Sequence, residues 1–304
     1  MCSKRRFVCV WSVSALDKAP RVKGDWVRTA VQAAVTLLYN CKLPNFFRGV
    51  IDDGPLKHVC VPGLNCYSCP GAIGACPMGA LQNMPKSKGK VQFPYYVLGM
   101  LILFGLLLGR FICGFLCPFG WVQDLLYRIP FFKKVRTFKG DRVLRFVKYG
   151  VLVLLCFLFP MLLSGKYNTT PFFCKFLCPS GTLLAAIPML LNGAVTTDQL
   201  GVLFWWKFAV LNVVLVTSLA IARPFCRYLC PLGAFYGLFN RVSVVKVHFA
   251  PDACVRCGKC AAVCPMGLDP TKEHASVECI RCGRCAKACP THALKLGVLR
   301  QKGK

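Results

Sequence analysis

Acidic residues are scarce in this 304-residue chain, where 11 Asp and Glu stand against 39 Lys and Arg and the net charge is +28. Such an excess suggests nucleic-acid binding, but the basic residues flank apolar segments and form no tract interleaved with aromatic residues. Histidine is also rare. None of the four lies in an apolar stretch of membrane length, which disfavours a b-type haem held between helices. No G-x-G-x-x-G follows an expected strand, so a dinucleotide site has no support.

Apolar residues make up 56% of the chain, which is too high for most soluble folds. Four apolar stretches approach the ~20 residues that a helix needs to cross the hydrocarbon. They cover residues 26–43, 91–109, 149–165 and 201–222. In the last stretch Lys207 follows Trp205 and Trp206, as at a helix end in the membrane interface. The sequence therefore predicts an α-helical integral membrane protein with about four transmembrane helices.

The distribution of Lys and Arg predicts the orientation, because cytoplasmic loops retain positive charge. Residues 1–28, 110–148 and 223–304 hold thirty of these residues, whereas 45–90 and 166–206 hold seven. Residues 1–24 lack the apolar core and cleavage site of a signal peptide, so residues 1–25 are interpreted as a cytoplasmic tail. We expect a multi-pass protein of a prokaryotic cytoplasmic membrane with both termini in the cytoplasm. Lys86, Lys88 and Lys90 lie on the predicted outer side and go against the rule.

The C-terminal segment carries the sequence C-V-R-C-G-K-C-A-A-V-C-P and then C-I-R-C-G-R-C-A-K-A-C-P. This is the bacterial two-cluster pattern, in which three thiolates of one run bind a cluster and the fourth, before proline, reaches the other cluster. Zinc modules usually pair two C-x-x-C units across a longer gap. The spacing predicts an α+β ferredoxin domain over 248–304 with two [4Fe–4S] clusters and crossed ligand sets: Cys254, Cys257, Cys260 and Cys289 for one, and Cys279, Cys282, Cys285 and Cys264 for the other.

This ferredoxin segment is basic, with ten Lys or Arg against four Asp or Glu over residues 248–304. A basic face could dock an acidic redox protein or partner subunit, mainly by raising the encounter rate. Attraction to the anionic inner leaflet explains the same charge equally well. The sequence leaves both interpretations open.

The membrane half, over residues 26–240, contains an internal repeat. G-R-F-I-C-G-F-L-C-P-F-G after the second stretch resembles A-R-P-F-C-R-Y-L-C-P-L-G after the fourth, and A-C-P-M-G-A-L-Q resembles L-C-P-S-G-T-L-L. Each half reads as helix, outer C-P loop, helix and inner C-x-x-x-C-P motif. We therefore expect two tandem two-helix repeats related by an axis along the membrane normal.

This symmetry would gather four inner thiolates, enough for one cubane: Cys113, Cys117, Cys226 and Cys230. A second metal site on the outer side has more candidate ligands than positions: Cys60, Cys66, Cys69, Cys76, Cys174 and Cys178. Two alternatives remain, since thiols at C-x-x-x-C spacing can simply pack and the outer set could form disulfides in an oxidising exterior. Cys156 has no spaced partner and is interpreted as a packed thiol, while Cys2, Cys9 and Cys41 stay unassigned.

With these motifs, the chain from residue 26 onward resembles the NapH-type polyferredoxins, membrane subunits of a quinol dehydrogenase that serves periplasmic nitrate reductase. The segment N-C-Y-S-C-P-G-A-I-G-A-C-P-M-G-A-L-Q, both inner C-x-x-x-C-P motifs and the ferredoxin carry the resemblance. It implies electron exchange between a cytoplasmic or quinone pool and a partner across or beside the membrane. The additional C-x-x-x-C-P at Cys174 departs from the family pattern.

The leading hypothesis is an electron-transfer subunit with two ferredoxin clusters and one or two further clusters in the membrane half. Because the hydrocarbon is ~30 Å thick, a complete relay needs C-P loops that enter the membrane half and are buried in protein. Two other classes remain: a metal reductase or assembly factor whose outer thiolates bind copper, and a redox-sensing membrane regulator. The donor, the acceptor and the direction of flow are left open.

Overall fold

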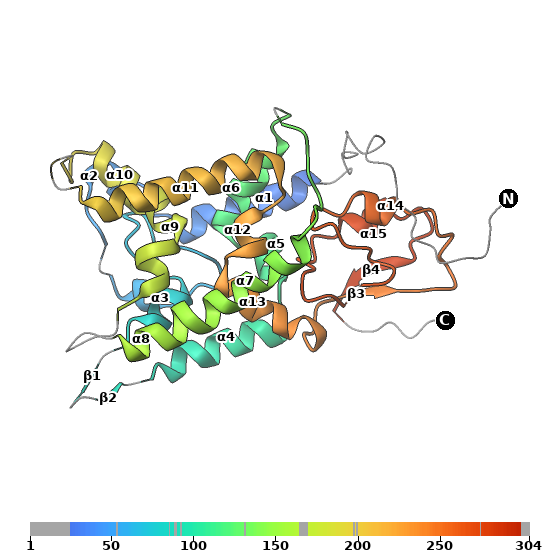
Figure 1. Ribbon diagram of the computed structural model, residues 1–304, viewed down its shortest axis with the longest axis horizontal. Coiled ribbons are helices and arrows are strands. Elements are labelled where there is room, and N and C mark those ends of the chain that lie inside the picture. The colour runs from blue at the N-terminus through green and yellow to red at the C-terminus, as the bar shows by residue number, and fades with distance from the viewer. Residues whose placement is uncertain are drawn as a thin grey trace.

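A computed structural model describes residues 25–52, 54–84, 86–87, 90–91, 93–130, 132–163, 170–196, 198, 200–273 and 275–298. The expected cytoplasmic tail, apart from Asp25, lies outside these residues, and so do Cys2, Cys9 and Lys88. The helices form an elongated body, and the ferredoxin segment lies at one end of it (Figure 1).

The first part of the membrane half runs to Arg128. Its elements are α1 (Asp25–Tyr39), α2 (Pro44–Arg48), η2 (Pro55–His58), α3 (Pro77–Gln82), the antiparallel pair β1 (Lys86–Ser87) and β2 (Lys90–Val91), α4 (Tyr95–Leu107), α5 (Phe111–Phe115) and α6 (Pro118–Arg128).

The second part begins with one long helix that is interrupted by a π-helical turn. Its elements are α7 (Asp141–Val153), η3 (Leu154–Leu158), α8 (Phe159–Leu162), η4 (Phe173–Leu177), α9 (Pro179–Gly181), η5 (Thr182–Ala186), α10 (Ile187–Leu191), α11 (Val202–Ala220), α12 (Pro224–Tyr228), α13 (Pro231–Leu238) and η7 (Phe239–Arg241). The ferredoxin segment pairs β3 (Lys246–Phe249) antiparallel with β4 (Leu294–Gly297) and carries α14 (Lys259–Ala262) and α15 (Arg284–Ala288).

Two helices of the described chain are long and apolar enough to cross a membrane: the 22-residue helix Asp141–Leu162 and the 19-residue helix Val202–Ala220. Only 22% and 17% of their apolar windows are buried inside the protein, so most of this apolar surface faces outward. Contiguous exposed apolar surface of this kind marks a membrane or a partner. These two helices correspond to the third and fourth expected spans and support membrane association.

The other two expected spans are shorter than ~20 residues. Helix α1 has 15 residues, and it buries Arg28 and Gln32 against the protein. Helix α4 has 13 residues and ends before Gly109, whose φ of +53° no regular helix allows. A Cβ on Gly109 would also lie 2.9 Å from Asn240 Oδ1. The structure thus supports two spans, and a count of four stays a prediction.

Four helices of the membrane half begin in the same way. A cysteine with extended backbone occupies the N-cap position and a proline follows at the first helical position, where its missing N–H costs nothing. These cysteines are Cys76 before α3, Cys117 before α6, Cys178 before α9 and Cys230 before α13. The C-P motif therefore turns the chain sharply into a helix and leaves each thiol at the helix start.

The ferredoxin segment is fixed to the membrane half by buried polar contacts. Arg110 Nη1 lies 2.9 Å from Glu278 Oε2, and Lys148 Nζ lies 2.6 Å from the same oxygen. Asn240 Nδ2 donates to the carbonyl of Cys279 at 2.8 Å. These contacts place the second ferredoxin cysteine run directly against α5, α7 and η7.

Candidate iron–sulfur centres

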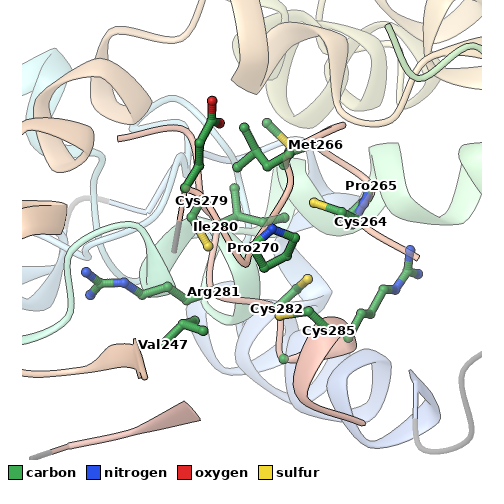
Figure 2. A pocket seen from close by; sticks show the side chains of 14 residues that line it. Val247, Cys264, Pro265, Met266, Pro270, Cys279, Ile280, Arg281, Cys282 and Cys285 are labelled. Atoms are coloured by element: carbon green, nitrogen blue, oxygen red, sulfur yellow. The ribbon is translucent and has the colours of Figure 1, made fainter. Parts of the chain in front are cut away.

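Two cavities in the ferredoxin segment are each lined by one crossed set of four cysteines. One is lined by Cys264, Cys279, Cys282 and Cys285, whose side chains Figure 2 shows around it. The other is lined by Cys254, Cys257, Cys260 and Cys289. We name these the proximal and distal ferredoxin sites. The fold brings together the two sets that the spacing predicts, including the exchange of the fourth cysteine.

The two runs adopt the same turn because they repeat the same sequence. Arg256 and Arg281, each between the first two cysteines of its run, both have φ of +52°. Gly258 and Gly283, each before a helix, have φ of +72° and +75°. The left-handed backbone folds each C-x-x-C-x-x-C segment around its cavity. This conformation is costly for arginine and is retained where the surroundings determine it.

The proximal site is buried and its thiols interact. Burial, followed by the negative charges that Cys282 and Cys279 would carry, raises the pKa of Cys264 to about 12. The distal site is more open: Cys257 is exposed, and hydrogen bonds led by Thr291 outweigh burial and lower the pKa of Cys289. Four buried thiolates without a cation would repel one another. Metal binding deprotonates such thiols and removes the repulsion, which fits an iron–sulfur group.

The four predicted inner cysteines also converge. Burial and then the charges of Cys117 and Cys113, partly offset by Arg223, raise the pKa of Cys226 to about 12. The pKa of Cys230 is raised by burial and by the charges of Cys226, Cys113 and Cys117. The four thiols are therefore close enough for their charges to interact. We name this set, Cys113, Cys117, Cys226 and Cys230, the inner site.

A pair of buried arginines crosses between the repeats at the inner site. Arg110 precedes the first inner motif and donates through Nη2 to the carbonyl of Cys226 at 3.1 Å. Arg223 is the corresponding residue of the second motif and donates to the carbonyl of Cys113, while Asp124 balances its charge. The internal repeat aligns these two arginines, but the sequence did not indicate a function for either. In the structure they hold the two C-x-x-x-C-P turns together.

The outer cysteines separate into those that converge and those that do not. Burial, followed by the charges of Cys178, Cys76, Cys66 and Cys156, raises the pKa of Cys174. Burial and the charge of Cys66 raise the pKa of Cys178 to about 11. We name Cys66, Cys76, Cys174 and Cys178 the outer site. They are four of the six cysteines that the sequence left as candidates.

Of the remaining two candidates, Cys69 lies near Cys66 alone of this set, and Cys60 shows no interaction with another described cysteine. The Cys69 thiol donates to Asn40 Oδ1 at 3.4 Å, and its pKa is raised to about 11, mainly by burial. The pKa of Cys60 is raised by burial, and none of the charged groups in the described residues contributes to this shift. Cys156, expected to pack without a partner, is fully buried in the π-helical turn η3 and lies near Cys174. The sequence gave no indication that Cys156 lies near Cys174, because Cys156 is isolated in an apolar stretch.

The donors around the outer site suit a cluster. The backbone N–H groups of Ser180 and Gly181 point at the Cys178 sulfur. The hydroxyls of Ser180 and Thr182 are buried and have no hydrogen-bond partner among the described residues. Buried donors without partners cost free energy, and the sulfides and thiolates of a [4Fe–4S] cluster would accept from them. The residues present therefore fit the group.

Close backbone approaches connect the inner site to the proximal site and to the outer loop. A Cβ on Gly114, the residue after Cys113, would be 2.4 Å from the carbonyl oxygen of Ile280, which lies between two proximal ligands. At the other end, a Cβ on Gly63 would be 3.2 Å from the Cα of Cys117. Tyr236 on α13 donates to the carbonyl of Pro62 at 3.2 Å. The outer C-P loop thus reaches into the protein and touches the inner site.

Within the part of the chain that the structure describes, every cysteine is a free thiol. Among the same residues, no three His, Cys, Asp or Glu side chains converge tightly enough on one point to hold a single metal ion. Cubane ligands each bind a different iron and need not meet at one point.

Comparisons with known proteins match two kinds of 4Fe-4S domain to the chain. A 4Fe-4S binding domain matches three times, over residues 91–139, 149–196 and 202–249. Each match contains one C-x-x-x-C-P motif, so the matched unit is half of the two-helix repeat expected above. The motif at Cys174, which departed from the expected pattern, is one of these three copies. A 4Fe-4S dicluster domain matches residues 246–290. No solved structure matches the chain.

Several curated proteins are similar over most of the chain. An uncharacterized protein of Methanocaldococcus jannaschii is 30% identical over 61% of this chain and 71% of its own length. The methylamine utilization ferredoxin-type protein MauN of Methylorubrum extorquens is 29% identical over 71% of this chain and 70% of its own length. The electron transport protein YccM of Escherichia coli is 30% identical over 64% of this chain, which spans 54% of YccM.

The ferredoxin-type protein NapH of Haemophilus influenzae is 28% identical over 55% of this chain and 51% of its own length. The resemblance inferred from the cysteine motifs is thereby confirmed. The chain belongs to the polyferredoxin family of ferredoxin-type, 4Fe-4S-binding electron transport proteins that includes NapH, MauN and YccM.

Proposed function

We propose that this chain is a membrane-bound electron relay that exchanges electrons between a cytoplasmic or quinone pool and a redox partner, with two clusters in the ferredoxin segment and two in the membrane half. A [4Fe–4S] cluster supplies one-electron redox chemistry when bound. In this proposal the chain would supply four ligand sets, in the order distal, proximal, inner and outer. One observation carries the proposal: Gly114, beside Cys113, packs against Ile280 between two proximal ligands, and Gly63, three residues before Cys66, packs against Cys117.

The distal ferredoxin site is exposed and is suited to a soluble partner. Cys257 of the distal site is exposed, and so are the neighbouring Arg256 and Lys259, the first residue of α14. Positive side chains at this point would raise the rate of encounter with an acidic redox protein or partner subunit. The proximal site, in contrast, is covered by the membrane half. We therefore place electron entry or exit at the distal site, on the cytoplasmic side that the charge distribution predicts.

The outer end of the series is buried between short helices. Lys207 Nζ on α11 and Cys66 Sγ lie 3.5 Å and 3.4 Å from the position that a Cβ on Gly181 would take. A cation beside the outer thiolates would offset part of their negative charge. The outer site would exchange electrons with a quinol or with a protein on the outer side.

Iron content tests the proposal. Protein purified without oxygen should contain about sixteen irons, from two ferredoxin and two membrane clusters. Replacing Cys178 with Ser should remove the outer cluster and leave about twelve irons, because one of its four ligands is lost. Cys60→Ser is the matched control, since Cys60 is buried on the same side and lies outside the outer site. A wild-type protein with about eight irons would refute the membrane clusters.

A further inference from the structure

Two buried glutamines contact the membrane cysteines in the same way. Gln82 and Gln123 each lie six residues after a C-P cysteine, Cys76 and Cys117 respectively. Both side chains are fully buried. Each follows its C-P helix start by two turns and projects toward the opposite repeat. The repeated position suggests a shared task.

The contacts of Gln123 define this task at the inner site. Its Nε2 donates to the sulfur of Cys226 at 3.3 Å and to the carbonyl of Phe119 at 3.3 Å. Its Oε1 accepts from the backbone N–H of Phe225 at 3.2 Å. Since Phe225 directly precedes Cys226, the amide is held at both ends against the cysteine that it contacts.

Gln82 makes the same three contacts at the outer site. Its Nε2 donates to the sulfur of Cys174 at 3.8 Å and to the carbonyl of Met78 at 2.9 Å. Its Oε1 accepts from the backbone N–H of Phe173 at 2.9 Å, and Phe173 directly precedes Cys174. Both amides therefore contact the first cysteine of a C-x-x-x-C-P motif from the other repeat.

The corresponding positions of the second repeat do not carry this amide. Leu184 lies six residues after Cys178, and Tyr236 lies six residues after Cys230. Leucine has no donor, and the Tyr236 hydroxyl donates to a backbone carbonyl instead. Each membrane site thus has one fixed amide donor of this kind. Packing alone would not require glutamine, because an apolar side chain fills buried space without needing partners.

We propose that Gln82 and Gln123 are positioning residues that set the reduction potentials of the outer and inner clusters through N–H···S hydrogen bonds. Reduction adds negative charge to a cluster and its thiolates, so a donor aimed at sulfur stabilises the reduced state and raises the potential. The Oε1 contact keeps the donor in place and fixes the cysteine turn. This inference rests on the proposed function, because it requires clusters at both membrane sites.

The test is an EPR-monitored redox titration of the anaerobic full-length protein. Gln123→Glu keeps the acceptor for Phe225 and removes the amide donor, whereas Gln123→Met removes both. Each should lower the reduction potential of the inner cluster by about 59 mV, which corresponds to about a tenfold change in its one-electron redox equilibrium. The same substitutions of Gln82 should shift only the outer cluster. Cys230→Ser and Cys178→Ser assign the inner and outer signals.

Leu184→Met is the matched control and should leave every potential unchanged, because it changes a residue six positions after a C-P cysteine that donates to no sulfur. The inference is overturned if the Glu and Met variants keep their iron and the wild-type potentials. It is overturned as well if both variants at one position lose iron, since the glutamine would then be only structural. The proposed function fails separately, at the iron count of the wild-type protein.

Discussion

Replacing Glu278 with Gln should strongly destabilise the contact between the ferredoxin segment and the membrane half. The Glu278 side chain is 8% exposed, and its two partners, Arg110 and Lys148, are fully buried. Glutamine keeps the shape and one acceptor but leaves two buried cations without a counter-charge. Removing one partner of a buried ion pair costs about 3–5 kcal/mol, because the other charge remains desolvated. We expect a loss in this range in the free energy of unfolding.

The pH dependence gives a second signature of the same group. Burial opposes ionisation of Glu278, but the charges of Arg110 and Lys148 outweigh it, and the pKa lies below its ordinary value of 4.5. A lowered folded-state pKa means that the stabilisation is complete above the unfolded-state pKa. It is lost as the pH falls through the folded-state value. The wild type should therefore lose stability in acid, and the difference from Glu278→Gln should shrink there.

Denaturant unfolding in detergent, at neutral pH and in acid, measures both effects. Limited proteolysis between the ferredoxin segment and the membrane half reports directly on the contact between them. Asp52→Asn is the control, because Asp52 pairs with Lys42 at 2.7 Å and the lysine side chain is 41% exposed. Solvent screens such a pair, so the control should change little. A loss below about 1 kcal/mol for Glu278→Gln would refute the reasoning, since that is the size expected of a surface pair.

Two further predictions concern the route of the electron. Gly114→Val should slow electron transfer between the ferredoxin and membrane clusters after flash reduction, because its side chain would collide with the Ile280 carbonyl. Gly150→Ala, which meets nothing within 4 Å, should leave the rate unchanged, and equal rates for both variants would contradict the close approach. Charge reversal of Arg256 and Lys259 should slow reduction by an acidic donor protein and weaken the salt dependence of that rate. An unchanged salt dependence would place docking elsewhere.

The ferredoxin site was the part most fully predictable from sequence. In each site three ligands are separated by only two residues, and the fourth, before proline, follows the two-cluster pattern. Both cavities have the predicted linings. The inner set was predictable for a related reason: the repeat aligns Cys113 with Cys226, and symmetry brings aligned residues together. Local spacing and repetition are properties that a sequence displays directly.

The outer set and the helix lengths depended on tertiary structure. Six outer cysteines are spread over two segments, and only the folded structure shows that Cys60 lies apart from the others while Cys69 lies near Cys66. Within the first expected span, helix α1 has 15 residues, and its Arg28 and Gln32 face Asp124 inside the protein. An apolar scale reads such residues as interruptions and gives no sign of the buried partner. The two glutamines were unpredictable for the same reason, since their partners lie about a hundred residues away.

The most direct test of the relay measures electron flow across a sealed vesicle that contains the purified chain. A membrane-impermeant reductant outside would reduce the ferredoxin segment, and an impermeant acceptor trapped inside would report arrival. The account predicts acceptor reduction by the wild type and little by Cys226→Ser, which loses an inner ligand while the ferredoxin cysteines remain. Equal rates for the two proteins would contradict it, because the electron would then bypass the inner site.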